Sequence, residues 1–329
     1  MSKLPLTMAI SRYDHVADLL TGAVPVQGIE LNVLDLPLHD IFFRFIQFKE
    51  FDVAEISMAK YVSMISQGDD ALIALPVFPS RVLRHSSIYV RPDGPVKTPA
   101  DLAGRHVGVP EWAQTAGVYA RGLLTDEFGV DLASIEWFQA GQDQPGRQEK
   151  VQLNLPRGVA VTAVADKSLA DMLVGGELDA ILVAQPPRRY LDGHPNIVRM
   201  FEDFLDTEYR YAEKTKIIPI MHAVAMRKEI VDAHPWTVVN LLRAFEHAKN
   251  RSVERALYAG MTYFPILWGS EHARRTRHLF EGDYWPYGVE ANRRTLEVFL
   301  RYAHEQGVCH RLLRVEELFP SQVLQSYRV

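Results

Sequence analysis

The segment KTPADLAGRHVGVPEWAQTAG at 97–117 places the strongest constraint on the fold of this chain. It predicts a short helix that starts at a proline, a turn at Gly104, a brief buried strand, and a second helix that begins near Gln114 and Thr115. A strand that runs through a tight loop into a helix is the repeating unit of α/β folds. Free N–H groups in the first turn of such a helix attract a carboxylate or phosphate, so the segment predicts an anion-binding loop.

The remainder of the chain continues this alternation of strands and helices. In the first ninety residues, strands are predicted at 4–10, 29–36 and 51–57, and helices at 17–22, 43–50 and 58–68. Extended apolar runs at 71–90 and 216–228 predict two crossings between lobes. The predicted fold is therefore α/β and two-lobed, with 1–90 plus 220–329 forming one lobe and 91–219 the other. Each lobe is expected to be a mostly parallel sheet flanked by helices, with a ligand cleft between the lobes.

Composition and charge exclude several classes of protein. The 47% hydrophobic and 23% charged content is that of a soluble globular protein, and the net charge of −5 is dispersed, which argues against a nucleic-acid partner. The first 25 residues hold no apolar block long enough for export, and later apolar runs are too short to span a membrane. With Cys309 as the single cysteine, the expected location is the reducing cytoplasm.

Several longer motifs carry a resemblance to one family. They are SRYDHVADLLTG at 11–22, FDVAEISMAKYV at 51–62, VFPSRVLRHSSIYV at 77–90, GVPEWAQTAGVYARG at 108–122 and YWPYG at 284–288. The chain resembles the 4,5-dihydroxyphthalate decarboxylase family over nearly its whole length. The resemblance implies a type II periplasmic-binding-protein-like fold and a carboxy-lyase activity in phthalate catabolism. The implied reaction is loss of one carboxylate from 4,5-dihydroxyphthalate, which gives protocatechuate and carbon dioxide.

Decarboxylation of an arene needs three kinds of group around the ring. Cations or N–H donors hold the carboxylate that stays, an acceptor takes the phenolic proton, and an acid protonates the ring carbon. No organic cofactor is required in principle. Ligands of open α/β sheets bind beyond the carboxyl ends of the strands, so we expect the site in the loops at 11–15, 55–58, 80–87, 110–115 and 185–189.

The predicted catalytic residues are His15, His222 and Glu55. Histidine titrates nearest to neutral pH, and a carboxylate at a strand end is costly to bury unless it has a partner or a chemical role. The structural alternatives are a buried satisfied His222, and a Glu55 that pairs with an arginine. The same three residues could together bind a divalent metal ion. The sequence has no HExxH motif and no close pair of histidines with ligand spacing, so a required metal is not predicted.

Ten further residues are predicted to bind the substrate. They are Arg12, Tyr13, Ser57, Arg81, His85, Trp112, Gln114, Thr115, Gln185 and Arg188. A guanidinium such as that of Arg81 binds a carboxylate through two parallel hydrogen bonds, and an indole such as that of Trp112 stacks on an aromatic ring. The alternative for each arginine is a solvated charge, and for Trp112 it is interface packing; Arg147 is another candidate that faces the cleft.

Other functions on the same fold remain open from the sequence. One is a binding protein that holds a small aromatic carboxylate without turning it over. Another is a self-consuming or pyrimidine-precursor synthase, which would call for a histidine-rich centre with a cysteine, and only the distant Cys309 is available. The amphipathic stretch RRTLEVFLRYAHEQ at 293–306 packs either within the chain or in a homo-oligomer.

Overall fold

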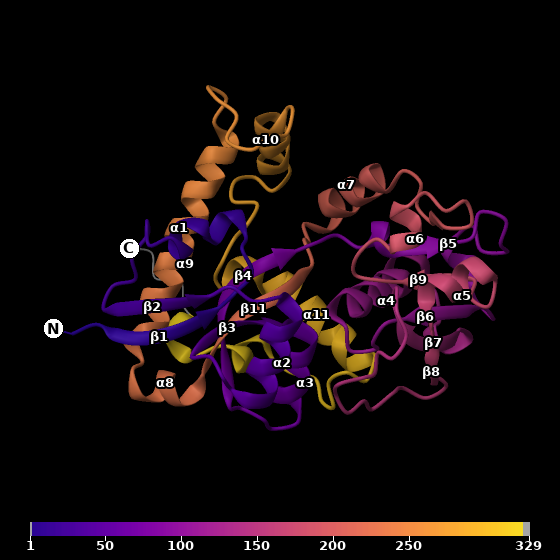
Figure 1. Ribbon diagram of the computed structural model, residues 1–329, viewed down its shortest axis with the longest axis horizontal. Helices are drawn as coiled ribbons and strands as arrows, with labels where there is room; N and C mark the ends of the chain where they lie inside the picture. Colours follow the sequence, from indigo (N-terminus) through magenta and orange to yellow (C-terminus); the bar gives the residue numbers. More distant parts are fainter. Residues whose placement is uncertain (1, 325–329) are drawn as a thin grey trace.

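The structure, a computed structural model, describes residues 2–324 and contains two β-sheets that lie side by side, each with helices packed on its faces (Figure 1). The chain leaves the first sheet after residue 81, builds the second sheet with residues 88–199, and returns to the first at residue 220. This is the predicted two-lobed α/β architecture. Among residues 2–324, no helix is both long and apolar enough to cross a membrane.

The first sheet has the strand order β2-β1-β3-β11-β4. Its strands are β1 (Leu4–Ala9), β2 (Ile29–Leu34), β3 (Val53–Ser57), β4 (Leu72–Arg81) and β11 (Ile220–Arg227). β1 pairs in parallel with β2 and β3, whereas β11 runs antiparallel to both β3 and β4. β4 is thus an edge strand, which is where a sheet tolerates prolines such as Pro76 and Pro79.

The second sheet has the strand order β10-β5-β9-β6-β7-β8. Its strands are β5 (Ile88–Val90), β6 (His106–Val109), β7 (Glu136–Gly141), β8 (Val161–Ser168), β9 (Ala180–Leu182) and β10 (Val198–Arg199). β6, β7, β8 and β9 pair in parallel, but β5 is antiparallel to β9 and β10. Both sheets are therefore mixed, because β11 in the first and β5 in the second run against their neighbours.

Eleven α-helices surround the sheets within residues 2–324. They are α1 (Ala17–Leu20), α2 (Leu38–Phe48), α3 (Met58–Ser66), α4 (Thr115–Phe128), α5 (Leu169–Gly175), α6 (Arg188–Leu191), α7 (Phe204–Thr215), α8 (Lys228–Ala233), α9 (Trp236–Leu257), α10 (Gly269–Leu279) and α11 (Arg293–Glu305). α2 begins five residues before its predicted start, directly after Pro37. The apolar run at 71–90, expected to be one extended crossing, breaks after Arg81 into a short 3₁₀ helix, His85–Ser87.

The C-terminal helix α11 ties the two lobes together. It packs against α3 of the first lobe and α4 of the second. The Tyr302 hydroxyl donates a 2.6 Å hydrogen bond to Asp126, and Gln306, just after the helix, accepts from the Trp112 indole through its carbonyl at 2.7 Å. Because this helix contacts both lobes, their relative position depends on how it packs.

We expect Gly122→Ala to destabilise the protein. A Cβ atom at Gly122 on α4 would overlap the ring of Tyr302 on α11, and overpacking of this kind costs about 1–3 kcal/mol. The free energy of unfolding from urea denaturation measures the loss. Gly175→Ala on α5 is the matched control, because its Cβ would meet no atom nearer than 4.0 Å. Equal stabilities of the two variants would contradict the packing of α11 on α4.

Candidate active site

Three side chains from distant parts of the chain meet at one end of the first sheet. Oε1 of Glu55 lies 2.6 Å from Nδ1 of His222 and accepts a 2.5 Å hydrogen bond from the Tyr13 hydroxyl. Oε2 of Glu55 accepts a 3.0 Å hydrogen bond from the backbone N–H of Ser11. Glu55 is fully buried, whereas the His222 side chain is 16% exposed. We refer to Tyr13, Glu55 and His222 as the acid–base trio.

Strand order explains why these residues meet. Tyr13 lies in the loop that follows β1, and Glu55 lies near the carboxyl end of the neighbouring parallel strand β3. β11 is antiparallel, so its first residues lie at the edge where β1 and β3 end, and His222 stands opposite Ser57 in the register. A histidine that is 167 residues away in sequence thereby reaches Glu55.

Electrostatics assign a role to each end of the imidazole. Burial alone would raise the pKa of Glu55. The hydrogen bond and charge of His222, together with the hydrogen bonds from Tyr13 and from the Ser11 N–H, hold that pKa below its ordinary value. Glu55 is therefore an anion at neutral pH, and it accepts from the Nδ1–H of His222. Nε2 is the ring nitrogen left to exchange a proton with a ligand.

Aromatic rings enclose the trio. Phe42 on α2 packs edge-on against His222, with ring centroids 4.9 Å apart. His15 lies between Tyr13 and Trp285, with its centroid 5.3 Å from each. Burial lowers the pKa of His15 to about 4, and its Nε2 has no hydrogen-bond partner within residues 2–324. His15 is thus neutral at pH 7 and belongs to the wall around the trio.

The starts of two helices meet beside the trio. Thr115, the first residue of α4, lies 2.9 Å from Ser57 through their hydroxyl oxygens, and its Oγ1 accepts a 3.0 Å hydrogen bond from the N–H of Ala59 in α3. Thr115 and Ser57 are both buried. Gln114 precedes Thr115, and its Oε1 is buried without a partner within residues 2–324. The predicted carboxylate binder Thr115 therefore connects the two lobes directly in this structure.

A buried charge cluster lies next to this contact. Nζ of Lys60 on α3 lies 2.7 Å from Glu111 and 2.9 Å from Glu149. Nε of Arg147 donates a 2.7 Å hydrogen bond to Glu111, and Nζ of Lys150 lies 3.9 Å from the same carboxylate. Burial alone would raise the pKa of Glu111, but these cations hold it below its ordinary value. Three cations surround two carboxylates, so the cluster carries excess positive charge.

Three of the predicted substrate-binding residues have side chains that are exposed to solvent. Arg12 points outward and pairs with Asp35 at 2.7 Å, although it is the neighbour of Tyr13 in sequence. Arg188 pairs with Asp192 at 3.0 Å on α6, with three quarters of its side chain exposed. Gln185 is exposed in the loop before α6. The structure does not support these assignments, since each of the three side chains is solvated and has no hydrogen bond to the trio among residues 2–324.

Trp112 belongs to the core of the structure. It is fully buried, its ring lies 3.8 Å below the guanidinium of Arg121, and it meets Trp137 edge-on at 5.2 Å. Its indole N–H donates to the carbonyl of Gln306. Both faces and the polar edge of the indole are occupied by protein, so the structure corrects the prediction that Trp112 stacks on a substrate ring.

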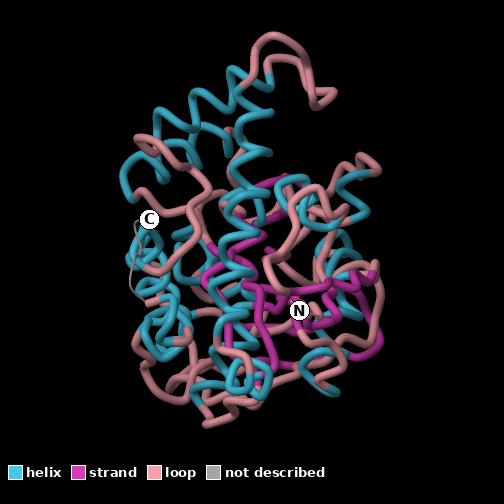
Figure 2. Tube along the Cα trace, turned by 90° about the vertical axis from the view of Figure 1, so that its left-hand side faces the viewer, coloured by secondary structure: helices cyan, strands magenta, loops and turns pink. Residues whose placement is uncertain are grey.

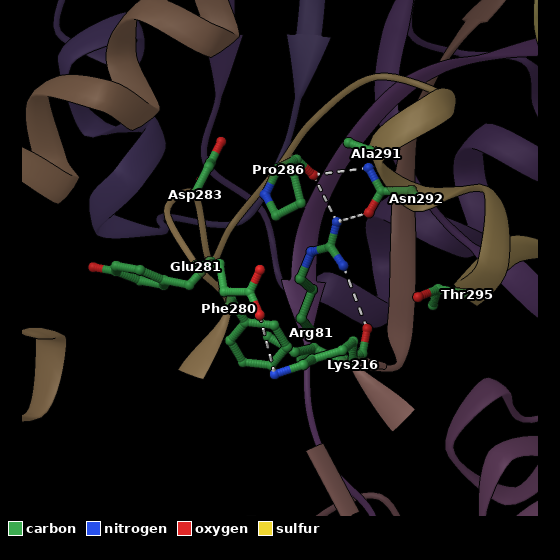
Figure 3. Close-up of a pocket in the computed structure, with 11 residues that line it drawn as sticks. Arg81, Lys216, Phe280, Glu281, Asp283, Pro286, Ala291, Asn292 and Thr295 are labelled. Carbon is green, nitrogen blue, oxygen red and sulfur yellow. Dashed lines mark hydrogen bonds and ion pairs between the residues drawn. The ribbon is translucent and has the colours of Figure 1, made fainter. Parts of the chain in front are cut away.

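Arg81 lines a separate pocket of about 230 Å³ beside the 280–295 segment (Figure 3). Its guanidinium donates to the carbonyls of Ile218 and Pro286 and to Oδ1 of Asn292. The ring of Trp285 lies 5.9 Å from this guanidinium and 5.3 Å from the imidazole of His15, and His15 does not line the pocket. The structure therefore corrects the expected clamp role, since Arg81 fastens the crossing segment to the 286–292 loop.

We expect His85, another predicted binding residue, to act on stability alone. It is buried edge-on between Phe201 and Tyr211, and burial lowers its pKa to about 4. An unfolded chain binds the proton below about pH 6.5, so His85 costs stability as the pH falls from about 6.5 to 4. His85→Phe should remove up to about 3 kcal/mol of that acid-induced loss, measured by denaturation at pH 7 and pH 4.5. An unchanged pH dependence would contradict the buried neutral histidine.

Several residues of the site carry no distinctive sequence signal. Phe42 and Trp285 belong to aromatic-rich stretches that read as packing, and Lys60 sits inside an ordinary helix pattern. Arg147 is the exception, since it lies in the polar loop QDQPGRQ that faces a strand end. Within residues 2–324, no three His, Cys, Asp or Glu side chains are arranged to hold a metal ion.

Comparison with known proteins places this site in a family. Over 330 residues, the whole of both chains, the sequence is 36% identical to 4,5-dihydroxyphthalate decarboxylase of Comamonas testosteroni. The chain belongs to the 4,5-dihydroxyphthalate decarboxylase family. It is also 36% identical to the enzyme of the same name from Pseudomonas putida over 204 residues. That match covers 62% of this chain and 79% of the relative.

The decarboxylase family shares its fold with transport receptors. Residues 9–263 match the family described as ABC transporter, phosphonate, periplasmic substrate-binding protein. Among solved structures, the periplasmic aliphatic sulphonate binding protein SsuA of Escherichia coli superposes with a TM-score of 0.55 at 11% identity, over 98% of this chain and 99% of that one. These matches confirm the predicted periplasmic-binding-protein-like fold.

Proposed function

We propose that this chain catalyses the non-oxidative decarboxylation of a hydroxylated aromatic diacid, with 4,5-dihydroxyphthalate as substrate and protocatechuate and carbon dioxide as products. Full-length similarity to a decarboxylase supports the reaction class. The observation that carries the assignment is the buried Glu55 carboxylate on Nδ1 of His222, because it prepares one histidine for proton transfer at Nε2. We place the reaction in the cytoplasm, since the free thiol of Cys309 fits a reducing compartment.

The chemistry requires one proton per turnover. A proton adds to the ring carbon that bears the departing carboxylate, and the hydroxyl para to that carbon becomes carbonyl-like as it takes up the positive charge. The bond to the carboxylate carbon then breaks, its electron pair restores the aromatic ring, and carbon dioxide leaves. Because the ring itself accepts the electrons, we propose that no organic cofactor takes part.

His222 is the proton donor in this proposal. Protonated at Nε2, it delivers the proton to the ring carbon, while the buried anion of Glu55 stabilises the imidazolium and fixes its orientation. Tyr13 donates to the same oxygen of Glu55 and so positions the carboxylate. Phe42 packs against His222 and excludes water from one side of the imidazole.

Arg147 and Lys150 hold the carboxylate that stays. Burial and then the charges of Arg147 and Lys150 lower the pKa of His39, so both cations lie within electrostatic reach of that residue. His39 and Phe42 share one face of α2, about one 5.4 Å helical turn apart, and Phe42 touches His222. We therefore place the carboxylate that stays, which is ortho to the departing one on the ring, against these two cations.

Arg147→Gln should raise KM for 4,5-dihydroxyphthalate by about 10- to 100-fold and leave kcat within about threefold, since loss of a charge-assisted hydrogen bond removes ground-state binding. Initial-rate kinetics measure both constants. Arg188→Gln, a surface arginine on α6, is the control and should change neither. The role is refuted by an unchanged KM in Arg147→Gln, or by a KM change in the control.

The direct test of the proposal is an assay of the purified chain with 4,5-dihydroxyphthalate, in which carbon dioxide and protocatechuate are both quantified. Phthalate, which lacks the hydroxyls that take up charge, is the matched control and should give no product. A parallel assay with chelator tests whether a divalent metal is needed, and we expect full activity. Tight binding without turnover would replace this proposal with a binding protein for aromatic carboxylates.

A further inference from the structure

The pocket that Arg81 lines has no part in the proposed reaction. Its volume is about 230 Å³, and none of the residues of the acid–base trio lines it. We call it the Arg81 pocket. A cavity of about 150 Å³ is large enough to hold one benzene ring. The Arg81 pocket therefore has room for a single aromatic ring with a polar substituent.

Three parts of the chain form the walls of this pocket. Arg81 ends β4, and Lys216 and Ile218 lie just before β11, so both connections between the lobes take part. α10 and the end of α9 project beyond the sheets, and residues 280–288 bring the chain back from α10 to the body of the molecule (Figures 1 and 2). The Arg81 pocket therefore lies where the two lobes join, and it forms only when this returning segment has folded against them.

Arg81 is a buried cation without a carboxylate partner. The residue is only 7% exposed, and its guanidinium donates to two backbone carbonyls and to the side-chain oxygen of Asn292. Among residues 2–324, no carboxylate lies within 4.0 Å of it, and its Nε is buried without a hydrogen-bond partner. Burial lowers the pKa of Arg81 to about 10, so the group remains charged at neutral pH. A buried charge that lacks an ion pair is stabilised by an anion that comes close to it.

Lys216 adds a second cation to the wall. Its Nζ donates a 2.8 Å hydrogen bond to the carbonyl of Leu279 and lies 4.0 Å from Glu281. The Glu281 side chain is 83% exposed, and an exposed ion pair at this distance is weak. Asp283, the other acidic residue of the wall, pairs at 2.6 Å with the fully buried Lys249. Two cations therefore line the pocket with one weakly held carboxylate, and this balance favours an anionic ligand.

Much of the remaining wall is aromatic or apolar. The side chains of this kind are those of Ile218, Phe280, Tyr284, Pro286 and Ala291. Figure 3 shows the ring of Phe280 beside the side chains of Arg81 and Lys216. An aromatic ring in a ligand packs well against such side chains. The cations and the apolar wall together fit a ligand that joins a carboxylate to one aromatic ring.

We propose that the Arg81 pocket is a binding site for a small aromatic monocarboxylate. The carboxylate of the ligand lies between Arg81 and Lys216, and its ring packs on Phe280 and Pro286. This site is distinct from the one that holds the acid–base trio. It goes beyond the proposed function, since binding in the pocket requires no turnover.

Crystallography locates the ligand. Crystals of the native chain soaked in 4-bromobenzoate should give an anomalous bromine signal in the Arg81 pocket. Crystals of Ala291→Trp should give none there, because the larger side chain fills the pocket; Ala291 is exposed, so we expect the fold to accept the change. A bromine signal in the native chain that appears only beside the trio, or in neither place, would overturn the proposal.

Affinity in solution supplies the second readout, from NMR titration of benzoate into Arg147→Gln, whose proposed catalytic site binds carboxylates poorly. Adding Lys216→Gln should weaken benzoate binding by about tenfold or more, since a charge-assisted contact is lost. Lys214→Gln, which changes a lysine with a 70% exposed side chain near the end of α7, is the matched control and should leave the affinity unchanged. Acetate, which lacks the ring, should bind about tenfold more weakly than benzoate or weaker still.

Two solution results would contradict the proposal. Equal benzoate affinities of the two lysine variants would refute binding beside Lys216, and equal affinities for acetate and benzoate would refute an aromatic ligand. Neither experiment measures turnover. A chain that binds benzoate in the Arg81 pocket but releases no carbon dioxide would therefore refute the proposed function alone.

Discussion

His222→Gln lowers kcat for 4,5-dihydroxyphthalate by about 10²- to 10⁴-fold, the range that a positioned acid contributes. Glutamine retains a group that can bond to Glu55 but has no titratable proton, so the fold survives while proton delivery fails. KM should stay within about threefold, because in our proposal Arg147 and Lys150, and not His222, hold the carboxylate that stays. Initial-rate kinetics on the purified variant measure both constants.

Two controls make this result specific. His272→Gln changes an exposed histidine on α10 and should keep the native rate. His15→Gln changes the neutral imidazole beside Trp285, and it should cost far less than His222→Gln because His15 makes no hydrogen bond to the Glu55 carboxylate. If His15→Gln abolished turnover and His222→Gln did not, the roles of the two histidines would be reversed.

Glu55→Gln lowers kcat by about 10²- to 10³-fold through loss of the anion that stabilises the His222 imidazolium. The NH₂ group of glutamine must also replace one of the two carboxylate oxygens. It then faces either the N–H of Ser11 or the donors Tyr13 and His222, so at least one buried hydrogen bond is lost. Tyr13→Phe removes one hydrogen bond and no charge, so we expect a loss of only about tenfold or less. Equal losses in these two variants would contradict the electrostatic role of Glu55.

The same substitution changes the pH dependence of stability. The pKa of Glu55 is lower in the folded chain than in the unfolded chain. The ionised group therefore stabilises the fold fully above its unfolded pKa, near 4.5, and this contribution is lost as the pH falls through the lower folded value. Glu55→Gln should be less stable than the native chain at pH 7, and the difference should shrink in acid. Denaturation at pH 7 and pH 3.5 measures it.

The sequence predicts the local units of this fold well because each carries its own pattern. FDVAEIS ends in the strand β3, MAKYVSMIS forms α3, and the segment at 97–117 forms β6 and the start of α4. The sequence does not predict the elements whose conformation depends on tertiary contacts. β8 is a mostly exposed strand at the edge of the second sheet, so it lacks the apolar alternation that would identify it.

For the site, a sequence can indicate which residues are chemically suitable but not which ones meet. Tyr13, Glu55 and His222 all stand out as polar groups near strand ends, yet their contact depends on β11 inserting antiparallel between β3 and β4. Arg81 and Trp112 look equally suitable in sequence. Their carbonyl partners come from segments that are distant in sequence, and those partners place both residues in structural roles.

The central claim is that this chain decarboxylates an aromatic diacid by proton transfer from His222. A single-turnover experiment, with enzyme in excess over 4,5-dihydroxyphthalate, separates binding from chemistry. The account predicts that the native chain releases one carbon dioxide per protocatechuate, and that His222→Gln binds the substrate with a Kd within about threefold but forms product at least about 10² times more slowly. Product formation by His222→Gln at the native rate, or binding without carbon dioxide release by the native chain, would contradict it.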